Sequence, residues 1–126
     1  MKEIKIIIIL GIILLVLDSI YITITKNIFS KMIQNIQHEK MVINLYGAIA
    51  CYMLLIFGLY YFIIKNKCSL LDAFLFGFII YGVFDSTSYA LFSKWSLKIA
   101  LMDAIWGGVL MTTTTYLTYK ILEFNI

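Results

Sequence analysis

The sequence predicts an all-α integral membrane protein, with four transmembrane helices in an up-down bundle and a short interfacial helix between the first two. Composition is the first reason, because the 126-residue chain is 63% hydrophobic and 13% charged, with no proline. Soluble domains carry about 25% charged residues, roughly twice that fraction. The second reason is the presence of four apolar runs, each longer than the roughly 20 residues that a helix needs to cross a bilayer. Lipid must therefore cover much of the surface.

The four predicted transmembrane helices cover residues 4–25, 41–64, 70–92 and 97–122 of a single domain, residues 1–126. Backbone polar groups in lipid must be paired within their own segment, and an α-helix does this. The runs do not alternate apolar and polar residues, as the strands of a transmembrane barrel do. Short connections between the runs favour antiparallel neighbours in the bundle.

The connecting segments carry their own signals. Residues 26–40 have apolar side chains at helical spacing, which predicts a short helix lying in the membrane interface. Ser69 precedes the third run and Asp72 follows three residues later, the spacing of a capped helix start. Trp95, in the last connection, suits an anchor at the membrane surface.

Glycines are expected where helices approach closely. Lipid supplies no hydrophobic force between helices, so small residues mark the points of tight packing. The glycines predicted to lie at helix contacts are Gly47, Gly77, Gly82, Gly107 and Gly108.

Three carboxylates interrupt the apolar runs, namely Asp18, Asp85 and Asp103. Each costs about 2.5–3.5 kcal/mol near the centre of a membrane helix, and such residues usually face the bundle interior and mark functional sites. Asp18 and Asp85 lie about seven residues before the ends of their runs, and Asp103 about six residues after the start of its run. In an alternating bundle these ends share one side of the membrane. The three carboxylates are therefore expected in one layer, about 10 Å deep by helix rise.

Aromatic and hydroxyl side chains share helix faces with these aspartates or lie at their depth. The residues predicted to line a ligand or ion site with them are Tyr21, Asn44, Tyr81, Thr87, Ser88, Tyr89 and Trp106. The layer contains no histidine or cysteine, so no metal site is predicted, and the sequence names no cofactor or catalytic residue.

The charge of the layer needs an explanation. Three like charges this close cannot all stay ionised without cations, and no lysine or arginine lies at that depth. We therefore expect that at least one aspartate is protonated, or that a cation or cationic ligand binds there. The alternative is that the aspartates only hold helices together. Interhelical polar contacts contribute about 0.6–2 kcal/mol, which barely offsets the insertion of three acids.

The segment "FGFIIYGVFDSTSYALFSKWSLKIALMDAIWGG" (76–108) contains F-G, Y-G, an aromatic-D-x-T, a downstream W and D-x-x-W-G. With Leu17-Asp18 and Tyr21, this pattern resembles domain-of-unknown-function family 2177, a family of small bacterial membrane proteins. The resemblance covers nearly all the chain. It departs at Ser88, where the family has Asn, and at Ser96, where the family has Pro. It implies a bacterial-type inner membrane and the site residues above, but no chemistry.

Three functions stay open at this point. The aspartate layer is suited to binding or transporting a proton, a cation or a small cationic solute, and a homodimer is expected because four helices are few for a transporter. Alternatively, an aspartate acts as general acid in an intramembrane enzyme, or helps to bind a lipidic or isoprenoid substrate. The third reading is a structural or accessory subunit. The bilayer is an expected partner, with a small-molecule or lipid ligand, whereas nucleic acid is not expected, because the chain lacks arginine and a basic face.

Overall fold

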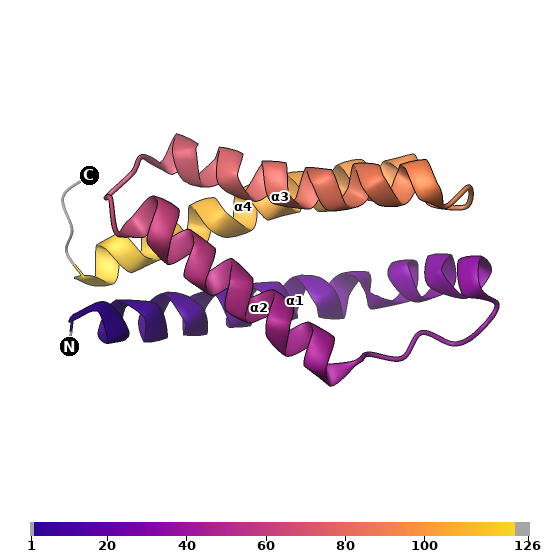
Figure 1. Ribbon diagram of the computed structural model, residues 1–126, viewed down its shortest axis with the longest axis horizontal. Helices are drawn as coiled ribbons and strands as arrows, with labels where there is room; N and C mark the ends of the chain where they lie inside the picture. The colour runs from indigo at the N-terminus through magenta and orange to yellow at the C-terminus, as the bar shows by residue number, and fades with distance from the viewer. Residues whose placement is uncertain (1, 123–126) are drawn as a thin grey trace.

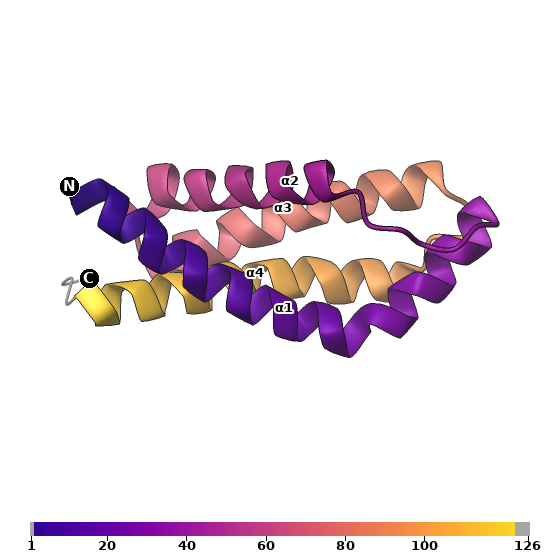
Figure 2. The same ribbon diagram turned by 90° about the horizontal axis from the view of Figure 1, so that it is seen from below.

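The computed structural model describes residues 2–122, and its regular structure is helical. The elements are α1 (Lys2–Gln37), α2 (Leu45–Leu59), the π-helical turn η1 (Tyr60–Ile64), α3 (Leu70–Leu91) and α4 (Leu97–Leu122). No strand occurs within residues 2–122. Successive helices run in opposite directions, so α1 begins at the end of the molecule where α4 finishes (Figures 1 and 2). The predicted all-α class is confirmed.

Within residues 2–122, three segments are long and apolar enough to cross a membrane. They are α1, the continuous stretch Leu45–Ile64 formed by α2 and η1, and α3. The fourth helix, α4, is 26 residues long but carries Asp103 and four consecutive threonines. That α4 also crosses the membrane stays a prediction.

The predicted interfacial helix is not a separate element. Residues 26–37 are helical, but they continue α1, which bends in its middle and does not break (Figure 2). No glycine or proline interrupts residues 22–37, so the helical backbone hydrogen bonds continue through them. The hydroxyls of Ser19, Thr23 and Thr25 each donate to the carbonyl four residues earlier, and such bonds bend helices. Met32 is then buried against Trp95 and Ala100, which keeps this half of α1 on the bundle.

Between α1 and α2 the chain leaves the helical conformation. His38 has φ 60° and its N–H donates to the Gln34 carbonyl at 2.9 Å, which ends α1. The Asn44 side chain accepts from the Gly47 N–H at 3.2 Å and starts α2. The helix expected from residue 41 therefore begins at Leu45. The predicted cap of α3 is present, with Ser69 Oγ accepting from the Asp72 N–H at 3.1 Å.

Helices α3 and α4 form the closest helix pair, and glycines permit it. A Cβ on Gly77 would lie 2.0 Å from the Gly107 carbonyl oxygen, and one on Gly107 would lie 2.3 Å from the Tyr81 ring. A Cβ on Gly108 would lie 2.5 Å from the Phe74 ring of α3. No side chain larger than hydrogen fits these positions without moving a neighbour.

The other two glycines predicted at helix contacts behave differently. Gly82 leaves ordinary space, because an added Cβ would lie 4.0 Å from Ala104. Gly47 is exposed and meets only its own capping residue. The predicted packing role does not fit Gly47, because the first residues of α2 are exposed.

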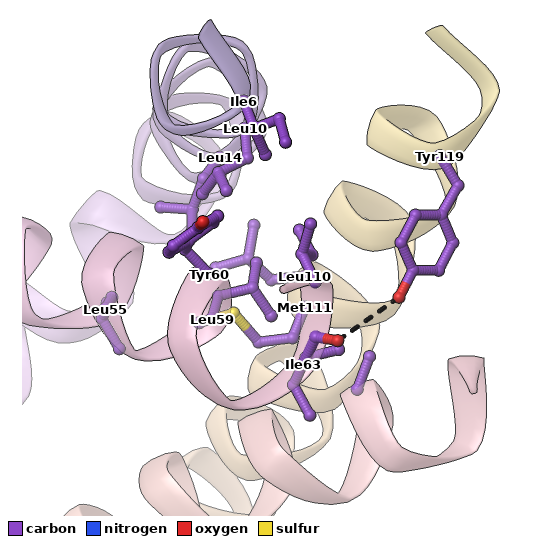
Figure 3. Close-up of a cluster of buried hydrophobic side chains, with 12 residues drawn as sticks. Ile6, Leu10, Leu14, Leu55, Leu59, Tyr60, Ile63, Leu110, Met111 and Tyr119 are labelled. Carbon is purple, nitrogen blue, oxygen red and sulfur yellow. Dashed lines mark hydrogen bonds between the residues drawn. The ribbon is translucent and has the colours of Figure 1, made fainter. Parts of the chain in front are cut away.

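Apolar side chains fill the half of the bundle in which α1 begins (Figure 3). This core combines residues from α1, α2, η1, α3 and α4, including Leu10, Leu14, Leu59, Leu110 and Met111. At its edge the Tyr119 hydroxyl donates to the Cys68 carbonyl at 2.8 Å and lies 3.5 Å from the Ile63 carbonyl, the bond drawn in Figure 3. The carboxylates lie beyond this core, toward the half in which α3 ends and α4 begins.

Candidate ligand-binding site

Asp18 joins three helices. It lies on α1 and is 6% exposed. Its Oδ1 accepts a hydrogen bond from Trp106 Nε1 of α4 at 3.0 Å, and its Oδ2 accepts one from the Tyr52 hydroxyl of α2. Both carboxylate oxygens therefore have protein donors, which stabilises the charged form without a cation.

Tyr21 connects this carboxylate to the next one. Its ring stacks on Trp106 with centroids 4.6 Å apart and planes 3° from parallel. Its hydroxyl donates to Asp103 Oδ1 at 2.9 Å. Since Trp106 holds Asp18, the stacked pair lies between Asp18 and Asp103 and fixes the position of both. Stacked aromatic pairs contribute about 0.5–1.5 kcal/mol beyond their buried area.

Asp85 is the most deeply buried of the three aspartates, at 1% exposure. Neither of its carboxyl oxygens makes a hydrogen bond to the part of the chain that the structure describes. The Asp103 carboxyl and the Trp95 indole N–H lie near enough to act on it. The Trp95 Nε1 atom is itself buried, with no hydrogen-bond partner among residues 2–122.

Trp95 was predicted to anchor the chain at the membrane surface, which requires an exposed side chain. The structure instead buries it. It is 6% exposed and packs with Met32 and Ala100. Its ring also meets Phe84 at 6.0 Å and Phe92 at 6.1 Å between centroids. The bend of α1 brings the buried Met32 over the connection between α3 and α4, and this contact buries the indole.

The larger cavity beside these groups has a volume of about 610 Å³. Asp18 and Asp103 belong to its wall, and Lys26 is the basic residue among those that line it. Aromatic rings form much of the remainder, contributed by Tyr21, Phe29, Tyr81, Phe84 and Trp95. Ile22, Ile33, Met41 and Ile43 make the rest of the wall mainly apolar. The cavity therefore combines two carboxylates with an aromatic and aliphatic surface.

A smaller cavity of about 420 Å³ lies between α3 and α4. Asp85, Ser86 and Tyr89 are its polar lining residues, and the others are apolar or glycine. Asp85 thus lines the smaller cavity, while its neighbours Asp103 and Trp95 line the larger one.

A family model described as "Predicted membrane protein (DUF2177)" matches residues 3–120. The chain belongs to this family. No curated protein and no solved structure matches the chain. Membership of DUF2177 makes the chain a membrane protein in contact with lipid, in agreement with its apolar helices. The matched residues include the three aspartates of the site and both tryptophans of this DUF2177 chain.

The structure brings together six of the residues predicted for the site in this DUF2177 member, namely Asp18, Tyr21, Tyr81, Asp85, Asp103 and Trp106. Ser88 is buried on α3, and Tyr89 is half exposed beside the smaller cavity. Asn44 and Thr87 do not join the group. Asn44 is exposed because it caps α2 in the connection, and Thr87 is exposed on the outer face of α3.

Several residues of the site were not predicted from the sequence, among them Tyr52, Trp95 and Lys26. Tyr52 is an aromatic residue inside an apolar run, and nothing in that run distinguishes it from its neighbours. Trp95 and Lys26 follow the ends of predicted helices, where anchoring at the membrane surface is the ordinary role of such residues. Only the rotation of α2 and the bend of α1 bring these side chains to the DUF2177 carboxylates.

Proposed function

We propose that the chain binds a small organic cation with an apolar body in the larger cavity. The Asp103 carboxylate carries this proposal. It lines the cavity, and its one side-chain hydrogen bond within the described residues comes from Tyr21. It therefore retains capacity to accept hydrogen bonds or to pair with a positive group.

Charge in the cavity wall supports this choice of ligand. Two carboxylates and one lysine line the cavity, so with both carboxylates ionised the wall carries one uncompensated negative charge. The two oxygens of Asp18 are already held by donors, which leaves Asp103 as the group for an incoming cation. A charge away from bulk water binds an opposite charge more strongly than it does at an open surface.

The remaining surface of the cavity indicates the rest of the ligand. Aromatic faces attract ammonium groups, and cages of aromatic rings are a common way to bind quaternary ammonium ions. The aliphatic side chains suit an alkyl or aryl body. A volume of about 610 Å³ lies within the range of small-molecule sites.

The bound cation could also be transported across the membrane, which is a second step of this proposal. Within the described residues, three segments have the length and composition of membrane spans, which are few for a complete path across a bilayer. A second copy of the chain would supply the missing helices, in the way that transporters are assembled from repeats. We therefore propose a homodimer for transport, whereas binding alone needs one copy.

The tryptophans make binding directly measurable. The chain has two, and Trp95 lines the cavity while Trp106 stacks on Tyr21. Octyltrimethylammonium, added to the protein in lipid nanodiscs, is expected to change the intrinsic tryptophan fluorescence with saturation. Octanol serves as the uncharged control and is expected to give no saturable change.

Asp103→Asn is expected to weaken the binding of octyltrimethylammonium at least about tenfold, or about 1.4 kcal/mol. Asp72→Asn is the matched control, because Asp72 is exposed at the start of α3, and it is expected to bind like the unmodified chain. Equal responses to octanol and to the cation, or full affinity in Asp103→Asn, would contradict the proposal.

The smaller cavity favours a second candidate, the binding of a lipidic or isoprenoid molecule. Its wall is apolar apart from three residues, and it lies between α3 and α4. Leu101→Trp would fill this cavity without touching the larger one. If a lipid is bound there, native mass spectrometry of the purified chain is expected to show it, and the Leu101→Trp variant is expected to lose it.

A further inference from the structure

Buried polar atoms without a hydrogen-bond partner gather at one place. Within the described residues there are five such side-chain atoms, and three of them are both carboxyl oxygens of Asp85 and the Nε1 of Trp95. The others are the hydroxyls of Thr114 and Thr115, which can bond to the preceding helical turn after a simple rotation. A carboxyl group and an indole have no such local partner.

An ionised carboxylate is the wrong form for this position. Burial without donors or a cation strongly disfavours the charge, and carboxyl groups so placed become neutral. The Asp85 side chain is 1% exposed. The groups that act on it are the Asp103 carboxyl of α4 and the Trp95 indole, and Tyr21 of α1 interacts with all three carboxylates. None of these groups is a cation.

We propose that Asp85 is a proton-binding site, protonated at neutral pH, whose O–H donates to the ionised carboxylate of Asp103. This arrangement gives each of the three atoms a partner. The indole N–H of Trp95 donates to one oxygen of Asp85, and the other oxygen carries the proton toward Asp103. The Asp103 carboxylate accepts from Asp85 and from the Tyr21 hydroxyl, so its charge is stabilised from two sides.

The proposed proton lies where it can control the charge of the larger cavity. Asp85 lines the smaller cavity, and Asp103 lines the larger one. The proton therefore lies between the two spaces, and its transfer from Asp85 to Asp103 would neutralise the carboxylate of the larger cavity. The protonation of Asp85 does not rest on the proposed cation site, because Asp85 is absent from the wall of the larger cavity.

Infrared spectroscopy tests the proposal in the absence of any ligand. The chain is purified in an alkyl maltoside, which has no carbonyl group, and the carbonyl stretch of protonated carboxyl groups is recorded at neutral pH. A band that shifts in heavy water is expected in the unmodified chain, in Asp18→Asn and in Asp72→Asn. Asp85→Asn is expected to remove it. Absence of the band from the unmodified chain, or its survival in Asp85→Asn, would overturn the assignment.

Asp103→Asn tests the pairing. An amide oxygen accepts a weaker hydrogen bond than a carboxylate does, so the band is expected to remain but to move to higher frequency. An unchanged band would overturn the contact with Asp103. If the variants do not fold, NMR of the unmodified chain still tests the proposal. With isotope-labelled aspartate, the carboxyl resonance of one of the four aspartates is expected at the protonated position at neutral pH, and four ordinary titrations would refute the proposal.

Discussion

The Tyr21 ring lies flat against the Trp106 indole, and each partner of the pair donates to a different carboxylate. The two aspartates are thereby held at fixed positions on opposite helices, Asp18 on α1 and Asp103 on α4. The arrangement differs for the two acids, because among the described residues Asp18 has two side-chain donors and Asp103 has one. Asp18 therefore has mainly a positioning role, and Asp103 is the group left for chemistry.

Removing the Tyr21 hydroxyl should weaken the joint between α1 and α4 but keep the stack. Tyr21→Phe is expected to lower the free energy of unfolding by about 0.6–2 kcal/mol, the range for interhelical polar contacts in membranes. Unfolding in mixed micelles, followed by circular dichroism, measures this. Tyr116→Phe is the control, because Tyr116 is exposed on α4 and should change little. Equal effects of the two variants would argue against the Asp103 contact.

Neutral amides at Asp18 and Asp85 should have opposite effects on stability. Asp18→Asn turns one of its acceptors into a donor that faces either Tyr52 or Trp106, so a loss of about 1–3 kcal/mol is expected. Asp85→Asn is expected to be neutral or stabilising, because the amide NH2 can donate to Asp103 and the amide oxygen can accept from Trp95, as the protonated carboxyl group is proposed to do. Thermal unfolding of both variants in the same detergent decides between these expectations. A loss in Asp85→Asn as large as that in Asp18→Asn would show that an amide cannot replace the Asp85 carboxyl group, against the proposed protonated form.

A methyl group between α3 and α4 should separate them. In Gly77→Ala the new Cβ would lie 2.0 Å from a backbone oxygen, and the expected loss is about 1–3 kcal/mol, typical of overpacking. Gly82→Ala is one turn away on the same helix with ordinary space, so it should be tolerated. Comparing the two unfolding curves checks the packing directly, and similar destabilisation would contradict it.

Glycine at the end of α1 should stabilise the chain. His38 adopts φ 60°, a left-handed conformation that costs about 1–2 kcal/mol for residues with a side chain. His38→Gly is expected to recover up to about 1 kcal/mol, whereas Gln37→Gly, placed one residue earlier inside the helix, should lose a similar amount. The midpoint of thermal unfolding reports both. A lower midpoint for His38→Gly would mean that the imidazole makes a contact of its own.

The sequence was sufficient to predict the helical class and the meeting of the three aspartates, because run length and residue depth depend only on helix rise. It was not sufficient for the partners of those aspartates. Tyr52 reaches Asp18 only because α2 is rotated about its axis so that this face points to α1. The sequence cannot predict that rotation, because the run is apolar on all its faces. Trp95 is buried by the bend of α1, which follows from hydroxyls bonding within the helix.

The boundary between α1 and the expected interfacial helix was missed for a related reason. Apolar periodicity predicts helix but not whether two helical segments share one axis, and no helix breaker lies between them. Asn44 was placed too deep because the residues before Leu45 are not helical. An error of four residues at a helix start moves a side chain by about 6 Å along the axis, enough to take it out of the site.

The tight contact of Gly77 with Gly107 also limits how the molecule can move. With backbone against backbone, α3 and α4 have no layer of side chains between them that could slide or yield, so they should behave as one rigid hairpin. Entry to the larger cavity must then come from displacement of α1 or of residues 38–44. The hinge of the molecule is therefore expected at the bend of α1, close to the side chains that a ligand would meet first.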